Sequence, residues 1–118
     1  MVKQPQIIDM LTAGMRGASA RQTVIANNIA NAQTPGYRRR VLDFENALAK
    51  AMESGDGISR PLDASVIMPD VTPADETGNN VDIDTEIGDL LKNSSTYKTY
   101  VRVLSKVYRQ MELAMTVQ

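Results

Sequence analysis

The stretch ANNIANAQTPGY, Ala26 to Tyr37, decides the fold because a long helix ends within it and the chain then turns sharply. Pro35 disfavours helical backbone at Thr34 and presets φ for the second position of a turn. Gly36 can take the positive φ that the third position of a type II turn requires. The stretch therefore predicts a helix C-terminus followed by a reversal of the chain.

Amide side chains cluster just before this turn. Asn27, Asn28 and Asn31 stand among small and apolar residues such as Ile29. An amide both donates and accepts hydrogen bonds, so directed bonds to a closely packed neighbour are expected here. From chemistry alone the segment also fits an ordinary helix C-terminus, and that reading stays open.

Working outward from the turn, two long helices are predicted, over residues 8–33 and 83–118, because seam residues recur at alternating steps of three and four. The acids at the start of the second helix can cap free N–H groups and meet the positive end of the helix dipole. The first seam comprises Ile8, Leu11, Met15, Ala18, Gln22, Ile25, Ile29 and Ala32. The second comprises Ile83, Ile87, Leu90, Ser94, Tyr97, Val101, Leu104, Tyr108, Met111 and Met115.

A chain that runs out along one helix and back along the other forms an antiparallel, coiled-coil-like pair, so the predicted fold is all-α. Gln22 and Ser94 are the polar residues of the two seams. Since buried polar groups prefer partners, the favoured register places them opposite each other. Shifts of the register by whole heptads also align the seams and remain open.

The middle of the chain, residues 34–82, is predicted to contain the turn, a short helix and a long loop within a single domain. Residues 42–52 have an amphipathic pattern, and residues 54–80 are rich in Gly, Pro and short polar side chains. Residues 66–68 are apolar enough to form a short strand or to pack on the helices. The cluster Arg38-Arg39-Arg40 is expected to be solvated or paired with acids rather than to bind nucleic acid.

The second predicted helix carries more apolar side chains than one seam can bury. A helix that is apolar around most of its circumference belongs inside something larger. Further copies of the chain or related chains are expected to cover the surplus, although the segment 42–52 could do so instead. The expected subunit interface comprises Leu91, Tyr100, Val103, Val107, Leu113 and Val117.

Composition excludes most catalytic classes. The 118 residues contain neither Cys nor His, so thiolate chemistry, the usual zinc ligands and the usual neutral-pH proton shuttle are missing. We expect no catalytic, metal or cofactor site and no enzyme. The net charge of −1 gives no reason to expect nucleic acid as a partner. No segment has the continuous apolar run of a secretory signal or a membrane span, so direct membrane insertion is not expected.

Two segments carry a resemblance to a known family. ANNIANAQTPGY resembles the N-terminal signature of the bacterial flagellar axial proteins, which are the rod, hook and hook-filament junction subunits. The region Gly78 to Met115, which begins GNNVDIDTE, resembles the C-terminal signature of the FlgB family of proximal rod subunits in the basal body. The signature residues are Asn27, Asn28, Ile29, Asn31, Thr34, Pro35, Gly36, Tyr37, Asn79, Asn80, Val81, Asp82, Asp84 and Glu86.

This resemblance implies a non-enzymatic structural subunit, exported by the flagellar type III apparatus without a cleaved signal peptide. It implies polymerisation through the terminal helices into the periplasmic rod that transmits motor torque. The implied partners are other rod subunits and further copies of the chain, the adaptor FliE, the membrane-embedded basal ring and the export gate. The alternatives are another short rod subunit or a soluble coiled-coil adaptor or chaperone-like module, which heptads alone would also permit.

Overall fold

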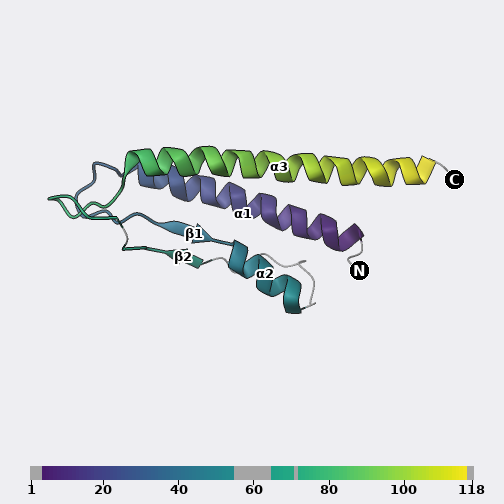
Figure 1. Ribbon diagram of the computed structural model, residues 1–118, viewed down its shortest axis with the longest axis horizontal. Helices are drawn as coiled ribbons and strands as arrows, with labels where there is room; N and C mark the ends of the chain where they lie inside the picture. Colours follow the sequence, from purple (N-terminus) through teal and green to yellow (C-terminus); the bar gives the residue numbers. More distant parts are fainter. Residues whose placement is uncertain (1–3, 55–64, 71, 117–118) are drawn as a thin grey trace.

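The computed structural model describes residues 4–54, 65–70 and 72–116 and shows an elongated molecule of 67 × 27 × 16 Å. The elements in chain order are α1 (Gln4–Ala30), β1 (Val41–Asp43), α2 (Glu45–Ser54), β2 (Ser65–Ile67) and α3 (Ile83–Thr116) (Figure 1). The all-α prediction is confirmed, with a small two-stranded sheet added to it. Within the described residues, no helix combines the length and the hydropathy needed to cross a membrane.

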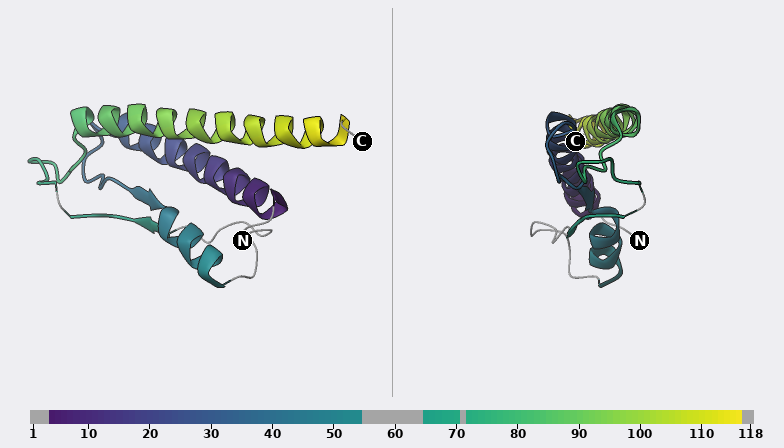
Figure 2. Two further views of the ribbon diagram at one scale, coloured as in Figure 1. Left: turned by 45° about the vertical axis from the view of Figure 1, so that its right-hand side comes forward. Right: turned by 90° about the vertical axis from the view of Figure 1, so that its left-hand side faces the viewer.

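The two terminal helices form an antiparallel pair. They lie closest at the end where the chain reverses and diverge toward the N-terminus of α1, and α3 extends past that terminus (Figure 1 and Figure 2). The predicted register is confirmed where it was defined, because Gln22 Nε2 donates to Ser94 Oγ at 3.5 Å. Next to this contact, Asn93 Nδ2 donates to the carbonyl of Ala18 at 2.7 Å and to Gln22 Oε1 at 2.8 Å.

On α1 the predicted seam lies at the core. Leu11, Ala18 and Ile25 are buried, and the other predicted positions that the structure describes are half-buried: Ile8, Met15, Gln22, Ile29 and Ala32. On α3 half of the predicted seam is displaced by one residue. Leu90, Ser94, Leu104 and Met111 are half-buried, whereas Ile83, Ile87, Tyr97, Val101, Tyr108 and Met115 are exposed.

The buried residues of α3 are Glu86 and Asn93, each one position before a predicted seam residue. Seven residues after Asn93 the ring of Tyr100 packs on Gly14 of α1, so a Cβ at Gly14 would overlap that ring. The seam was misplaced because apolar patterning favours Ile87 over the acid beside it. Burial of Glu86 and Asn93 is compensated by hydrogen bonds to α1, which patterning does not reveal.

The middle of the chain forms a second layer on α1. Strands β1 and β2 pair antiparallel, with Leu42 opposite Val66, and β1 and α2 pack on α1. The predicted helix over 42–52 was therefore wrong at its start, since α2 begins at Glu45 and the preceding residues are in β1. The short strand expected near residues 66–68 is present as β2.

Phe44, the one Phe of the chain, fixes this second layer to α1. Its ring is fully buried and packs on Gly17, where a Cβ would overlap it. The guanidinium of Arg21 lies 4.5 Å from the ring centroid and donates to the carbonyl of Leu42 at 3.3 Å. The layer lies on the side of α1 away from α3 (Figure 1, Figure 2), so the segment 42–52 does not cover the outer surface of α3.

Candidate functional site

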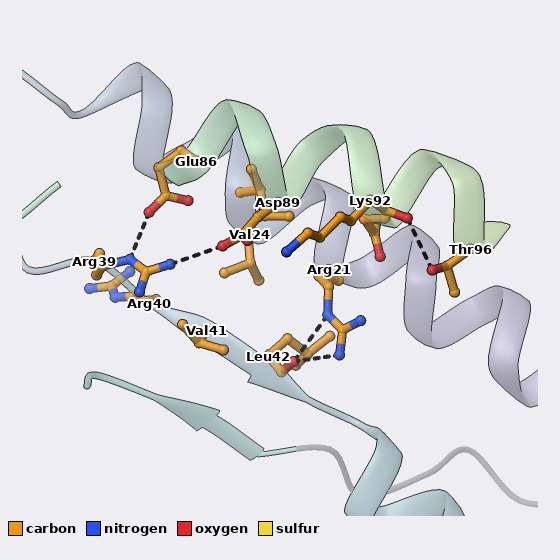
Figure 3. A pocket seen from close by; sticks show the side chains of 12 residues that line it. Arg21, Val24, Arg39, Arg40, Val41, Leu42, Glu86, Asp89, Lys92 and Thr96 are labelled. Carbon is orange, nitrogen blue, oxygen red and sulfur yellow. Dashed lines mark hydrogen bonds and ion pairs between the residues drawn. The ribbon is translucent and has the colours of Figure 1, made fainter. Parts of the chain in front are cut away.

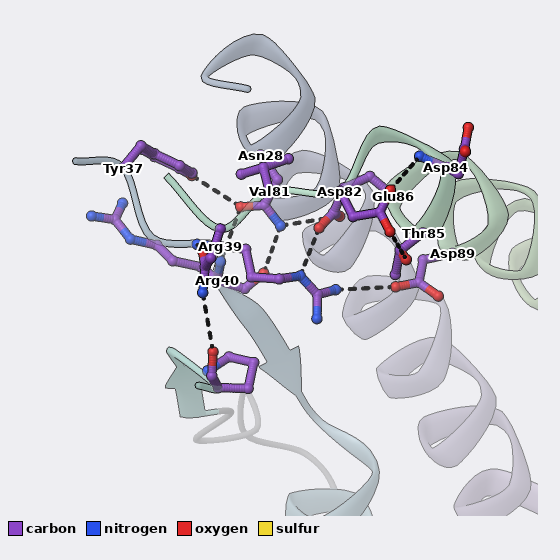
Figure 4. A network of polar contacts seen from close by, with 12 residues as sticks. Asn28, Tyr37, Arg39, Arg40, Val81, Asp82, Asp84, Thr85, Glu86 and Asp89 are labelled. Atoms are coloured by element: carbon purple, nitrogen blue, oxygen red, sulfur yellow. Dashed lines mark hydrogen bonds and ion pairs between the residues drawn. The ribbon is translucent and has the colours of Figure 1, made fainter. Parts of the chain in front are cut away.

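Asn28 is the centre of a buried polar junction that joins the end of α1 to the start of α3 (Figure 4). Its Nδ2 donates to the Arg40 carbonyl at 2.8 Å and to Glu86 Oε2 at 3.1 Å. Its Oδ1 accepts from the hydroxyl of Tyr37 and from the amide of Arg40, both at 3.0 Å. Both donors and both acceptor sites of the amide are thus used, so Asn28 ties three separate segments together.

Glu86 is the buried acid of this polar junction, and Arg39 neutralises it. Arg39 Nε donates to Glu86 Oε1 at 2.7 Å, and a second guanidinium nitrogen lies 3.3 Å from Asp89 Oδ2. The Glu86 side chain is fully buried and that of Arg39 is 12% exposed. A buried carboxylate without a partner is costly, so the arginine makes burial of Glu86 tolerable.

The two asparagines before α3 complete the junction from the other side. Asn79 Nδ2 donates to the carbonyls of Asn31 at 2.9 Å and of Thr34 at 2.8 Å, which satisfies acceptors just past the end of α1. Asn80 Oδ1 accepts from the amide of Arg39 at 2.6 Å. Both asparagines are buried. The C-terminal signature segment therefore caps the helix that the N-terminal segment ends.

The turn after α1 has the geometry expected from its sequence. Gly36 has a φ of 75°, and the Tyr37 amide donates to the Thr34 carbonyl at 3.2 Å. The Gly36 amide donates to the carbonyl of Thr77 at 2.8 Å, so the turn is also joined to the loop before α3.

That loop is organised by Asp75. Its carboxylate accepts from the hydroxyl of Thr77 at 2.6 Å, from the amide of Thr77 at 2.8 Å and from the amide of Asn79 at 3.1 Å. These hydrogen bonds, with that of the Thr77 hydroxyl the largest effect, lower the pKa of Asp75 below its usual value of 3.8. The predicted extended loop is thus partly a structured turn in the residues described.

Asp82 supplies the N-cap that the sequence predicts for α3. It accepts from the amide of Asp84 and from the hydroxyl of Thr85, both at 3.1 Å. Asp84 itself is exposed in the first turn. The capping role expected for the acids of this segment is confirmed for Asp82.

The arginine triplet is paired with acids and an aromatic ring, as expected. Arg38 pairs with Asp70, and Arg40 lies 5.6 Å from the ring centroid of Tyr37. Together with the pairing of Arg39, these contacts show that the cluster stabilises the chain's own fold.

Beside the junction, α1, β1 and α3 enclose a cleft of about 260 Å³ (Figure 3). Arg21 and Arg39 line it, but each already pairs with an acid, Glu45 and Glu86 respectively. Asn93 also lines the cleft, and within the described residues its buried Oδ1 has no hydrogen-bond partner. The cleft therefore offers already-paired charges and one unsatisfied acceptor.

The structure brings together most of the signature residues and leaves the others at the surface. Asn27, Pro35 and Asp84 are exposed, and Ile29 is half-buried. Those with hydrogen bonds in or beside the junction are Asn28, Asn31, Thr34, Gly36, Tyr37, Asn79, Asn80, Val81, Asp82 and Glu86.

The expected subunit interface divides into two groups. Leu91, Val103 and Leu113 are exposed. Tyr100 and Val107 are half-buried, and both fall on the α1-facing side of α3, because Asn93, Tyr100 and Val107 are seven residues apart. Val117 lies outside the described residues.

Sequence reasoning missed several residues that determine the packing. Gly14 and Gly17 admit aromatic rings from two different elements, and a pair of glycines inside a predicted helix is a signal that could have revealed this. Arg39 had no such signal, because nothing distinguishes it from its neighbours in the triplet.

Three relatives and one family model are similar to this chain. The model of the flagella basal body rod protein family matches residues 8–38. The FlgB basal body rod protein of Yersinia enterocolitica is 38% identical over 104 residues, 71% of this chain and 74% of the relative. That of Bacillus subtilis is 29% identical over 119 residues and covers 92% of each chain. That of Salmonella typhimurium is 33% identical over 111 residues, 77% of this chain and 79% of the relative.

Proposed function

The chain belongs to the FlgB family of flagellar basal body rod proteins, and from this premise we propose that it polymerises through its terminal helices into the proximal rod, the shaft that transmits motor torque. As a member of this family it is a structural component of the flagellar basal body and not an enzyme.

The observation that carries the proposal is the uncovered outer surface of α3. Leu91 is 65% exposed, Leu113 is 58% exposed and Met115 is 69% exposed. Exposed apolar side chains on one element favour contacts with another protein. Many such contacts, repeated from subunit to subunit without closing on themselves, produce a helical shaft.

The polar junction supports the same proposal. It fixes the relative position of α1 and α3 through bonds between residues far apart in the sequence, such as Asn28 and Glu86. A pair of helices held in one register presents the same surface from every copy. Transmission of torque requires subunits of this kind, because a helix pair free to slide would yield under load.

We further propose that the chain reaches the periplasmic rod through the flagellar type III apparatus without a cleaved signal peptide. Its proposed neighbours are other rod subunits and itself, the adaptor FliE, the membrane-embedded basal ring and the export gate. This part of the proposal follows from the family alone.

Leu113→Asp tests the polymerisation directly. Leu113 is exposed in the single chain, so the variant is expected to keep the helical content of the wild type by circular dichroism. If α3 packs against another subunit there, the buried charge should prevent incorporation into basal bodies and abolish motility. The neighbouring exposed residue supplies a matched control, Glu112→Gln, which is expected to swim normally. Normal motility of the Leu113→Asp variant would contradict the proposal.

A further inference from the structure

Charges of opposite sign occupy separate segments of this chain. Every charged residue between Arg60 and Lys92 is acidic, and every charged residue from Lys92 through Arg109 is basic. The acidic segment includes the loop before α3 and the first turns of α3, and the basic segment is the middle of α3. The small net charge of −1 therefore conceals a strong separation along the molecule.

The bases of α3 gather on one face of the helix. At 3.6 residues per turn they fall within an arc of about 120°, on the side opposite Asn93 and therefore opposite α1. All are exposed, and within the described residues none of them forms an ion pair. We call these residues the basic stripe: Lys92, Lys98, Arg102, Lys106 and Arg109.

The acids at the other end of the molecule are similarly available. Glu76, Asp82 and Asp84 are exposed and lie in the loop and first turn at the end where the chain reverses (Figure 1). Within the part of the chain that the structure describes, no base pairs with them. We call these three residues the acidic end.

We propose that the acidic end of one copy of this chain docks on the basic stripe of a second copy. The inference rests on the proposed function and names the contact through which copies would meet. Complementary charges supply both orientation and partner choice at an interface. The basic stripe spans about 26 Å of helix, so it can receive the compact acidic end without overlap with the α1–α3 seam.

The geometry makes this contact directional. The acidic end lies at one end of the 67 Å molecule and the basic stripe lies along its shaft, so the two patches of one copy cannot meet each other. A contact between two different patches is heterologous and leaves a free patch on each terminal copy. Copies joined in this way extend along one axis, as a shaft requires.

Cysteine crosslinking in assembled basal bodies tests the contact. The chain has no Cys, so introduced pairs report without background. Ile83→Cys beside the acidic end and Thr99→Cys on the basic stripe change no charge, and both positions are exposed. They lie about 24 Å apart on the same helix, far beyond disulfide reach, so any disulfide must join two molecules.

Oxidised basal bodies carrying both substitutions are expected to yield dimers of this chain. Thr99→Cys combined with Ala49→Cys on α2, also exposed, should yield none. Basal bodies that contain the doubly substituted chain but give no dimer, or give links only to a different rod protein, would overturn the contact and leave the rod function intact. A wild-type chain absent from basal bodies would overturn both.

Charge exchange supplies a second test. Arg102→Glu with Lys106→Glu is expected to reduce swimming by at least tenfold, and adding Glu76→Lys with Asp84→Lys should restore most of it. Failure of this rescue while helical content is unchanged would overturn complementarity as the basis of the contact. Binding of the purified chain to phosphatidylglycerol vesicles, lost in the Arg102→Glu Lys106→Glu variant, would assign the basic stripe to a lipid surface and overturn the proposal as well.

Discussion

Asn28 shows at the scale of a single residue how one amide can hold three segments together. It is fully buried, and every hydrogen-bonding position of its side chain is occupied by Tyr37, Arg40 or Glu86. An amide in this state cannot be replaced by a shorter side chain without leaving buried partners unsatisfied.

The substitution Asn28→Ala is expected to lower the free energy of unfolding by roughly 2 to 4 kcal/mol, because buried partners lose their hydrogen bonds. Thermal unfolding followed by circular dichroism measures the change. Asn27→Ala is the matched control, since Asn27 is exposed and is expected to change stability by less than about 0.5 kcal/mol. Equal effects of the two substitutions would show that the polar junction does not stabilise the fold.

Asp75 gives the polar junction a defined dependence on pH. The hydrogen bond from the Thr77 hydroxyl is the main cause that lowers the pKa of Asp75 below 3.8, so its carboxylate form is favoured by folding. The stabilisation it supplies is therefore complete above the unfolded-state pKa and is lost as pH falls through the lower folded-state value.

We expect the amides of Thr77 and Asn79 to lose protection from hydrogen exchange as the pH falls below 3.8, after correction for intrinsic exchange. Exchange followed by mass spectrometry between pH 2 and pH 6 checks this. Asp75→Asn should remove the pH dependence in this loop. A loop equally protected across the whole range would contradict the role given to Asp75.

The turn and the cap were predictable from residue chemistry, and the polar junction was not. Pro35 and Gly36 act through their own backbone preferences, so the turn could be predicted from a few letters. The bond between Asn28 and Glu86 depends instead on where two distant helices meet. Nothing local to either residue encodes that distance.

At the scale of the elements, two glycines determine how α1 receives its neighbours. Gly14 accepts the ring of Tyr100 from α3, and Gly17 accepts the ring of Phe44 from the second layer. Glycine inside a helix costs stability relative to alanine. Here the close approach of a ring offsets that cost.

Gly17→Ala is accordingly expected to destabilise the chain by about 1 to 3 kcal/mol, because the new Cβ would displace the buried ring of Phe44. Gly88→Ala on α3 is the control, since nothing lies within 4 Å of a Cβ there. That substitution should stabilise the helix by up to about 1 kcal/mol. Thermal unfolding of both variants decides the point, and stabilisation by Gly17→Ala would contradict this packing.

The existence of both long helices, their antiparallel pairing and the contact between Gln22 and Ser94 could be predicted from the spacing of seam residues. The side of α3 that faces α1 could be predicted only in part. Spacing rules count apolar side chains, whereas α3 turns Glu86 and Asn93 inward because α1 supplies their hydrogen-bond partners.

At the scale of the whole molecule, the described residues form a helix pair with a second layer on one side only. That layer lies against α1, and the outer surface of α3 carries both exposed apolar residues and the basic stripe. An elongated subunit that keeps one long helix uncovered is suited to assembly, because the same helix can contact several neighbours. Membership of the FlgB family gives this surface its context in the basal body rod.

Crosslinking mass spectrometry of purified flagellar basal bodies tests most directly the claim that this chain is built into the rod through α3. The lysines of the basic stripe, Lys92, Lys98 and Lys106, are exposed and supply reactive positions on that surface. We predict links from these lysines to rod subunits, including further copies of this chain. Clean basal bodies that lack the chain, or that contain it with links only from α1 and α2, would contradict the account.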